Sequence, residues 1–342
     1  MLAAIGVLLL GAAIGVGGWA LWADRSSTVD VDADGGTTTG TAALVPAPGP
    51  ITIALAGDVT AAGQLVDRLV ASPERFVGPL ADALGAADLA VVNLDTALGG
   101  EAAPPAVLGA LAAAGIDVVS AANDRSLDLG AGPLLDVVAA DPAAGSVIGV
   151  GADEAAAYRP FVRDVGGHTV AVIAATQVLD PDRIATDTAG PGQPGVASAK
   201  RVDRLVAEVE AAREAADTVV VFLHWGTPGE TCPNPSQQEL AAALVAAGAD
   251  VVAGAGASRV QGAGRLGDAA VSYGLGSVLV DVPEDRETGV LLVRIQGREV
   301  LGIDWVPGRI GDDGVAFPLA GDEGAAATAL WAERRSCTDL AP

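Results

Sequence analysis

Histidine, lysine and aromatic side chains are scarce in this 342-residue sequence. It has two histidines and only 3% Phe, Trp and Tyr, and Lys200 is its single lysine, whereas 51% of the residues are hydrophobic. The core must therefore consist mostly of Ala, Val and Leu. Acidic residues outnumber basic ones by 43 to 19, which gives a formal charge of −24. Such a surface repels phosphate backbones, so the composition excludes nucleic acid as a partner.

Cysteine is also rare, with only Cys232 and Cys337 present. Neither belongs to a C-x-x-C pair, so no zinc or redox motif is indicated. In a domain outside the cytoplasm, an isolated pair favours a disulfide. Closing a loop of about a hundred residues would stabilise the fold by up to ~4–5 kcal/mol in the chain-entropy model. The alternative is two buried free thiols.

Charge is absent from residues 2–23, a length that spans ~30 Å of hydrocarbon as a helix. Trp19 and Trp22 lie near its end, where aromatic rings favour the membrane interface. The pattern predicts a single-pass membrane protein with residues 1–23 as its anchor. A cleaved signal peptide is the alternative, but no basic residue precedes the segment and 20–23 is a poor cleavage site.

Large apolar residues are nearly absent from 24–50, which is rich in Ser, Thr, Gly, Asp and Pro. That composition predicts a flexible linker, because it cannot bury enough apolar surface to offset the entropy of ordering. The folded domain is expected over residues 51–342.

A short unit recurs four times in that domain: small residues, an Asp, an apolar strand, and then polar residues. Its four copies are Asp88 before 89–92, Asp117 before 118–122, Asp217 before 218–223, and Asp250 before 251–253. Continuous apolar strands between helices belong to sheets covered on both faces. In α/β sheets the functional site lies at the carboxyl ends of the strands.

Other segments complete an α/β pattern. The spacing predicts helices over 61–69, 106–114 and 199–215, the last with Ser198 as N-cap, and a helix from Asn234 to Gly248. Residues 161–165 and 169–174 predict a hairpin, and 270–274, 289–295 and 300–306 predict strands. The mixture indicates two mixed β-sheets packed together and flanked by helices.

Six side chains that suit metal binding follow predicted strands: Asp58, Asn93, Asp95, Asn123, Asp124 and His224. Oxygen ligands with one imidazole suit a divalent metal such as Mn, Fe or Zn. Each residue taken alone also has a structural interpretation, as a helix cap, a turn residue or a buried core histidine. Their joint placement at strand ends favours a metal site.

The order of six sequence blocks resembles the CapA family, the poly-γ-glutamate capsule-synthesis proteins with a calcineurin-like metallophosphoesterase fold. The blocks are AGDV at 56–59, VNLDT at 92–96, ANDRSLDLG at 122–130, HWG at 224–226, GAGASRVQ at 254–261 and YGLGS at 273–277. The resemblance implies a metallophosphoesterase-like sandwich and, since family members are anchored or exported, an extracytoplasmic domain.

Departures from the family pattern affect the metal site. Where the family has Asn-Asn-His, this chain has Asn-Asp-Arg. Arg125 therefore replaces the histidine that, by the resemblance, would donate a proton to the leaving group. An arginine cannot give up its proton near neutral pH. The family's Gly-x-His-x-His is GAGAS at 254–258, which removes two imidazole ligands. Asp58, Asp95, Asp124 and His224 remain, enough for one metal, and His168 lies in the predicted hairpin.

Three functions follow from this comparison. The first is a membrane-anchored, catalytically impaired CapA-like protein that acts with an envelope polymer or its synthesis machinery, with one divalent metal or none. The second is a hydrolase or peptide-modifying enzyme that uses a single metal ion. The third is an unrelated binding role in which Arg125 supplies a permanent cation. If the site is metal-free, Arg125 is expected within salt-bridge distance of Asp58, Asp95 or Asp124.

Overall fold

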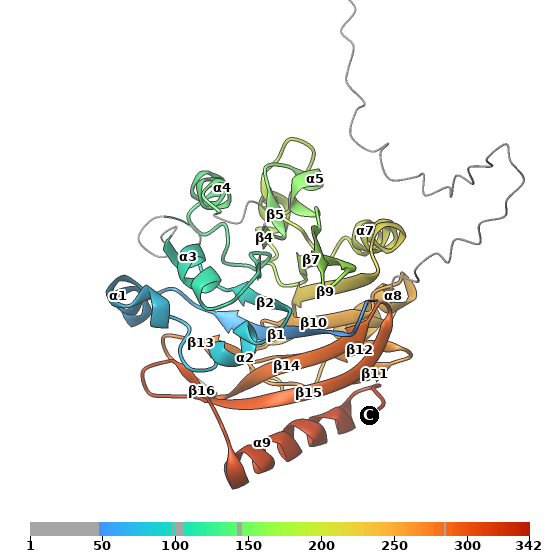
Figure 1. Ribbon diagram of the computed structural model, residues 1–342. Helices are drawn as coiled ribbons and strands as arrows, with labels where there is room; N and C mark the ends of the chain where they lie inside the picture. Colours follow the sequence, from blue (N-terminus) through green and yellow to red (C-terminus); the bar gives the residue numbers. More distant parts are fainter. Residues whose placement is uncertain (1–47, 98, 100–105, 142–145, 284) are drawn as a thin grey trace, which may run out of the picture. The chain divides into compact units, whose positions relative to one another are not determined.

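The computed structural model describes residues 48–97, 99, 106–141, 146–283 and 285–342, which contain two large β-sheets flanked by helices (Figure 1). The sheets are mixed, as the sequence pattern predicts, and the α/β class is confirmed.

The larger sheet has eight strands and carries β1 near its middle. Its strands in spatial order are β16 (Ala316–Pro318), β15 (Glu299–Ile310), β14 (Glu287–Gln296), β1 (Ile51–Val59), β2 (Leu89–Leu94), β3 (Val118–Ser120) and β4 (Val147–Ile148), while β13 (Ser277–Leu279) pairs with the end of β1. The pairs β1–β2, β2–β3 and β3–β4 are parallel, so their carboxyl ends meet at one edge.

The smaller sheet has six strands and also aligns parallel carboxyl ends. Its spatial order is β11 (Ala263–Leu266), β12 (Ala269–Ser272), β10 (Val251–Ala255), β9 (Thr218–His224), β7 (His168–Thr176) and β6 (Phe161–Val165). The predicted hairpin is confirmed as the antiparallel pair β6–β7. A separate two-stranded sheet joins β5 (Val150–Gly151) to β8 (Gly195–Val196).

Helices cover the outer faces of both sheets. They are α1 (Gln64–Ala71), α2 (Ala81–Gly85), α3 (Ala106–Ala113), α4 (Ala131–Ala139), α5 (Glu154–Ala157), α6 (Ile184–Asp187), α7 (Val202–Ala215), α8 (Pro235–Ala246) and α9 (Gly321–Glu333), with 3₁₀ turns at Pro73–Arg75 and Arg334–Cys337. Asn234 caps α8 and forms a capping box with Gln237, as expected of a helix that starts Asn-Pro.

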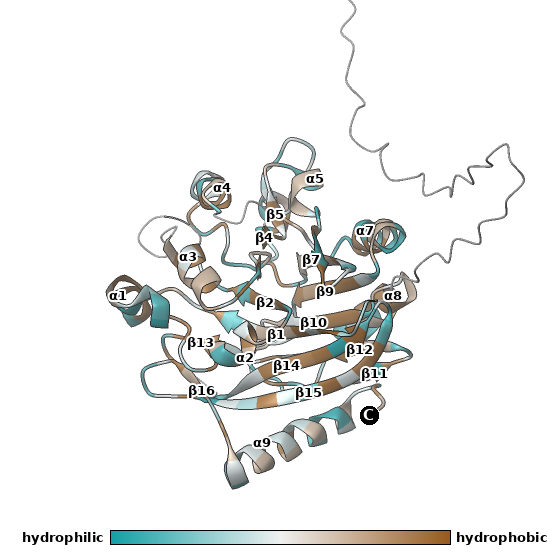
Figure 2. Ribbon diagram, viewed as in Figure 1, coloured by the Kyte–Doolittle hydropathy of each residue, from teal (hydrophilic) through white to brown (hydrophobic). Residues whose placement is uncertain are grey.

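The core is divided into layers by the alternation of side chains along the strands. Ile53 and Leu55 of β1 pack between the two sheets, whereas Ala54 and Ala56 face the helical side. A third cluster lies between the smaller sheet and helices α7 and α8. Both faces of the central strands are therefore buried, which explains why β9 and β10 are hydrophobic along most of their length (Figure 2).

The aspartate of the recurrent unit makes the same contact in all four copies. Its carboxylate accepts a hydrogen bond from a backbone N–H near the start of the neighbouring strand, and its own N–H donates to that residue's carbonyl. The pairs are Asp88 with Thr52 at 2.7 Å, Asp117 with Ala90 at 2.9 Å, Asp217 with Thr169 at 2.8 Å and Asp250 with Val219 at 2.8 Å. We call this two-bond contact the aspartate clip. It fixes the register of adjacent parallel strands at their amino ends.

The C-terminal segment is joined by a disulfide to the loop between β9 and α8, and it packs against β15 of the larger sheet. Cys232 and Cys337 form a disulfide, with Cα atoms 5.8 Å apart. Trp331 of α9 stacks on Trp305 of β15, with ring centroids 5.5 Å apart. Helix α9 and this stack were not predicted from the sequence.

The prediction of membrane localisation is corrected by the structure. Among the residues that are described, none of the helices is long and apolar enough to cross a bilayer. The segment on which the prediction rested, 2–23, lies outside the described residues, as do residues 24–47 of the predicted linker. The single-pass anchor, and the extracytoplasmic placement derived from it, therefore have no support in the structure.

Removing one aspartate clip should lower stability. We expect Asp217→Ala to reduce the free energy of unfolding by about 1–2 kcal/mol, because the N–H of Thr169 loses a charged acceptor. Asp217→Asn keeps an acceptor oxygen and should recover part of the loss. The measurement is urea unfolding, with the exposed turn variant Asp182→Ala as control, for which a change under about 0.5 kcal/mol is expected. Equal losses for Asp217→Ala and Asp182→Ala would contradict a structural role for the clip.

Candidate metal centre

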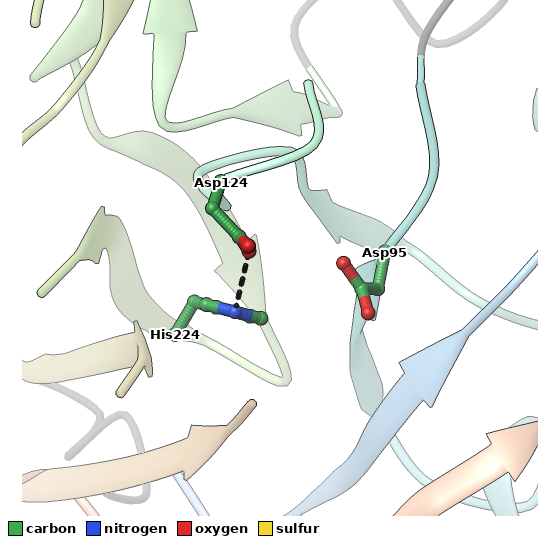
Figure 3. A group of neighbouring side chains, drawn as sticks. All are labelled: Asp95, Asp124 and His224. Atoms are coloured by element: carbon green, nitrogen blue, oxygen red, sulfur yellow. Dashed lines mark ion pairs between the residues drawn. The ribbon is translucent and has the colours of Figure 1, made fainter. Parts of the chain in front are cut away.

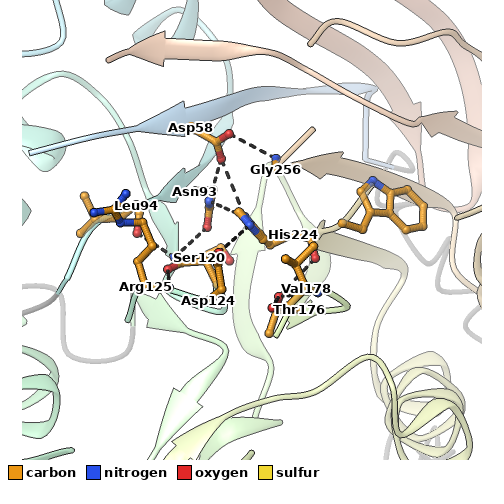
Figure 4. Close-up of polar contacts among 12 residues, drawn as sticks. Asp58, Asn93, Leu94, Ser120, Asp124, Arg125, Thr176, Val178, His224 and Gly256 are labelled. Carbon is orange, nitrogen blue, oxygen red and sulfur yellow. Dashed lines mark hydrogen bonds and ion pairs between the residues drawn. The ribbon is translucent and has the colours of Figure 1, made fainter. Parts of the chain in front are cut away.

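The polar residues predicted from the sequence meet where parallel strands of both sheets end (Figure 4). Asp58 lies at the end of β1, Asn93 on β2 and His224 at the end of β9. Asp95 and Asp124 lie in the loops that follow β2 and β3. The structure thus brings together residues up to 166 positions apart, Asp58 and His224.

Asp58 anchors a buried hydrogen-bonded chain. Its Oδ1 accepts from Asn93 Nδ2 at 2.7 Å and its Oδ2 accepts from the N–H of Gly256 at 3.2 Å. Asn93 Nδ2 also lies 3.1 Å from Nδ1 of His224, and Asp58 Oδ1 is 4.0 Å from the same nitrogen. The N–H of Asp58 donates to the carbonyl oxygen of Gly276, just before β13, at 3.1 Å. This close approach requires a glycine at position 57, where a Cβ would lie 1.8 Å from the same oxygen.

Three ligand-type side chains point toward one space: Asp95, Asp124 and His224 (Figure 3). One ligand atom from each lies within 4.8 Å of the others. His224 Nε2 contacts Asp124 Oδ1 at 3.1 Å. Asp95 Oδ1 is buried and has no hydrogen-bond partner. A buried carboxylate oxygen without a donor is costly, so this atom fits a cation as its missing partner.

The protonation of the cluster reflects its crowded acidic groups. Burial, followed by the charge of Asp95, raises the pKa of Asp58 to about 7. Burial also raises the pKa of Asp95, although the charge of His224 opposes it. Burial alone would lower the pKa of His224, but the hydrogen bond to Asp124 and the charges of Asp95 and Asp58 outweigh it and raise this pKa to about 9.

Asp124 differs from the other two carboxylates. Partial burial acts to raise its pKa, but the hydrogen bond and charge of His224 outweigh burial and lower it. Its side chain is 36% exposed, so the cluster opens to solvent on this side. The raised pKa values of Asp58, Asp95 and His224 all reflect the closeness of buried carboxylates, whose repulsion a divalent cation would also reduce.

Gly256 sets the position of the imidazole. Its φ is +100°, and a Cβ at this residue would lie 2.9 Å from the ring of His224. This glycine stands where the related pattern has its first histidine. A side chain at position 256 would therefore require the ring of His224 to move from its present position.

Arg125 does not occupy the place of a cation. Its backbone N–H donates to Asn123 Oδ1 at 3.1 Å, and its side chain is exposed. Across the described chain there is no ion pair between Arg125 and Asp58, Asp95 or Asp124. The salt bridge expected of a metal-free site is therefore not formed.

Two residues that support the site were not predicted. Ser126 Oγ donates to Asn123 Oδ1 at 3.0 Å, and the Gly256 N–H holds Asp58. The three-residue spacing of Asn123 and Ser126 is typical of a turn closed by a side chain, and this pattern could have indicated the role of Ser126. His168 lies away from the cluster, with Nε2 2.9 Å from the carbonyl oxygen of Gly49.

Comparison with known proteins agrees with the motif blocks. The family model described as "Bacterial capsule synthesis protein PGA_cap" matches residues 52–282. The chain belongs to this family. The CapA resemblance is confirmed by a capsule biosynthesis protein CapA of Bacillus anthracis, 30% identical over 191 residues. A probable polyglutamine synthesis accessory protein of Mycobacterium tuberculosis is 29% identical over 251 residues.

These relatives are longer than the regions they share with this chain. The matches cover 54% of this chain and 45% of the Bacillus protein, and 66% of this chain and of the mycobacterial protein. The solved structure of a novel phosphatase from Mycoplasma pneumoniae is 10% identical and aligns over 82% of this chain and 97% of that chain, with a TM-score of 0.48.

The close approach of Gly256 to His224 can be tested with two alanine variants. Gly256→Ala should cost about 2–4 kcal/mol of stability, because it adds a clash with the ring to the strain of a positive φ. Gly130→Ala is the control: its φ is +86° and its Cβ would have no neighbour within 4 Å. This control should cost only about 1 kcal/mol. Equal costs in urea unfolding would show that His224 is not packed against Gly256.

Proposed function

We propose that this chain is an accessory protein in the production of a capsule or envelope polymer of the poly-γ-glutamate type. It holds one divalent cation and acts through binding, with little or no hydrolytic turnover. The family description and the name of the Bacillus relative support a role in capsule synthesis. The name of the mycobacterial relative, a probable polyglutamine synthesis accessory protein, supports an accessory role in making an amino-acid polymer. The single observation that carries the proposal is the three-ligand cluster with the unpartnered Asp95 Oδ1.

The donor set fits one cation. Asp95, Asp124 and His224 would hold it, and two carboxylates with one imidazole suit Mn, Fe or Zn. Asp58 does not belong to this ligand group: its oxygens are engaged by Asn93 and Gly256, and it lies beside Nδ1 of His224. A bound cation at this point would supply Lewis acidity and attract anionic oxygens.

Weak turnover is proposed because the groups for two-metal hydrolysis are missing. Two-metal sites place ions ~3.5–4 Å apart and need two ligand sets. In the described residues only one such cluster is found. At the position of the family's proton donor, Arg125 keeps its proton, so no side chain there protonates a leaving group. A one-metal hydrolase is the second candidate, favoured by the solvent-facing side of Asp124.

The two histidines allow a matched test of the cation site. Purified full-length protein should bind one Mn²⁺ per chain, measured by metal analysis after dialysis. His224→Ala should lose at least ~90% of this metal, because it removes the only imidazole of the cluster. His168→Ala is the control and should bind metal as the wild type does, since His168 contacts Gly49 instead.

The same samples test turnover. Wild-type protein with Mn²⁺ should hydrolyse p-nitrophenyl phosphate no faster than His224→Ala. Hydrolysis at ordinary enzymatic rates that disappears in His224→Ala would replace the proposed binding role with the one-metal hydrolase. Less than half an equivalent of metal in the wild type would contradict the cation site itself.

A further inference from the structure

A cavity of about 430 Å³ adjoins the cluster and shares Asp95 with it. This volume lies within the ~300–1,000 Å³ typical of small-ligand sites. Its wall combines charged groups, hydroxyls and an apolar rim. Its wall includes Asp95, Arg125, Ser258, Val282 and the acidic pair Asp281 and Asp285.

The acidic pair is already engaged in holding its own loop. Asp285 Oδ2 pairs with Arg259 at 2.7 Å, and its Oδ1 accepts from the N–H of Arg286 at 2.7 Å. Asp281 Oδ1 accepts from the N–H of Gln64 at 3.0 Å. Asp285 is therefore paired with a cation, whereas Asp281 is held by a neutral backbone donor of α1.

Arg125 differs from these carboxylates, because no side chain among the described residues pairs directly with its guanidinium. Within the described residues, its guanidinium makes neither an ion pair nor a hydrogen bond, and only its backbone N–H is engaged. An exposed arginine is ordinary, but this one lines a cavity in a protein of net charge −24.

Two further features of the wall suit a ligand with anionic oxygens. Ser258 has a φ of +54°, the sole non-glycine residue with positive φ in the described chain, and its side chain lies in the cavity wall. Such strain is found most often at functional sites. Val282 is 74% exposed and gives the cavity an apolar rim that could contact methylene groups.

We propose that Arg125 forms an oxyanion-binding site in this cavity, which takes a carboxylate or phosphate group of a ligand. The planar guanidinium offers paired donors that match both anions. The ligand would lie between Arg125 and the cation cluster, because Asp95 belongs to both. The glutamyl probe chosen below rests on the proposed function, since each unit of a γ-linked glutamate chain carries a free carboxylate.

The test uses calorimetric titration of the full-length protein in buffer with EDTA, so that Arg125 is probed without a metal. The probes are γ-linked tetraglutamate, the same peptide with its carboxylates converted to amides, and inorganic phosphate. Arg125→Gln should weaken tetraglutamate binding about tenfold or more and abolish the preference for carboxylate over amide. Arg125→Lys should recover part of both.

Arg75→Gln is the matched control. Arg75 is exposed, lines a different cavity and pairs only weakly with Glu74, at 4.0 Å. Both Gln variants make the protein more negative by one charge, so a long-range effect would appear equally in both. Equal losses in Arg125→Gln and Arg75→Gln, or unchanged binding of tetraglutamate and phosphate in Arg125→Gln, would overturn the oxyanion site.

The titration with phosphate distinguishes a failure of the oxyanion site from a failure of the proposed function. If the wild type binds phosphate in an Arg125-dependent way but does not bind tetraglutamate, the oxyanion site stands and the glutamyl polymer is excluded as its ligand. If tetraglutamate binds equally well to the wild type and to Arg125→Gln, the polymer assignment is supported and the role of Arg125 is overturned.

Discussion

The aspartate clip is the interaction on which the rest of the structure depends. Four aspartates hold the amino ends of neighbouring parallel strands in register, two in each large sheet. Because side chains alternate along a strand, a shift of one residue would exchange the two faces of each strand and misplace every polar residue at the opposite end. The clips, at the amino ends of the strands, therefore help to position the polar residues at the carboxyl ends. The aspartates of the recurrent unit make structural contacts, whereas those at the strand ends form the cluster for which we propose a cation.

The carboxyl ends of the strands differ from the amino ends, because there several acidic side chains are brought close to one another. Asp58 is satisfied by Asn93 and Gly256, and Asp124 by His224. Asp95 keeps one buried oxygen without a donor. Arg125 is not paired with any of these carboxylates, and it lines the neighbouring cavity. The function that we propose combines one cation position with the fixed positive charge of Arg125, a combination suited to binding an anionic chain.

The sequence predicted those parts that depend on local patterns. Apolar strands bounded by Asp gave β2, β3, β9 and β10, and Asn234-Pro235 gave the start of α8. The start of α7 was wrong: Ser198 does not cap it, because Ser198 and Ala199 pair with the end of β7 and the helix begins at Val202. Two long-range features were also predicted, the Cys232–Cys337 disulfide and the meeting of polar residues at the strand ends. Other long-range contacts have no local pattern that indicates them. Nothing near Trp331 indicated its stack on Trp305, and the exposure of Arg125 depends on a fold that only the complete chain defines.

The most direct test is a crystal structure of the full chain grown with Mn²⁺, with anomalous scattering measured for the metal. The account predicts one anomalous peak per chain, bound by His224 Nε2 at ~2.0–2.2 Å and by oxygens of Asp95 and Asp124. Arg125 should remain unpaired with these carboxylates. Two peaks ~3.5–4 Å apart would indicate a two-metal hydrolase. No peak at the cluster, or Arg125 paired with Asp95, would contradict the cation site.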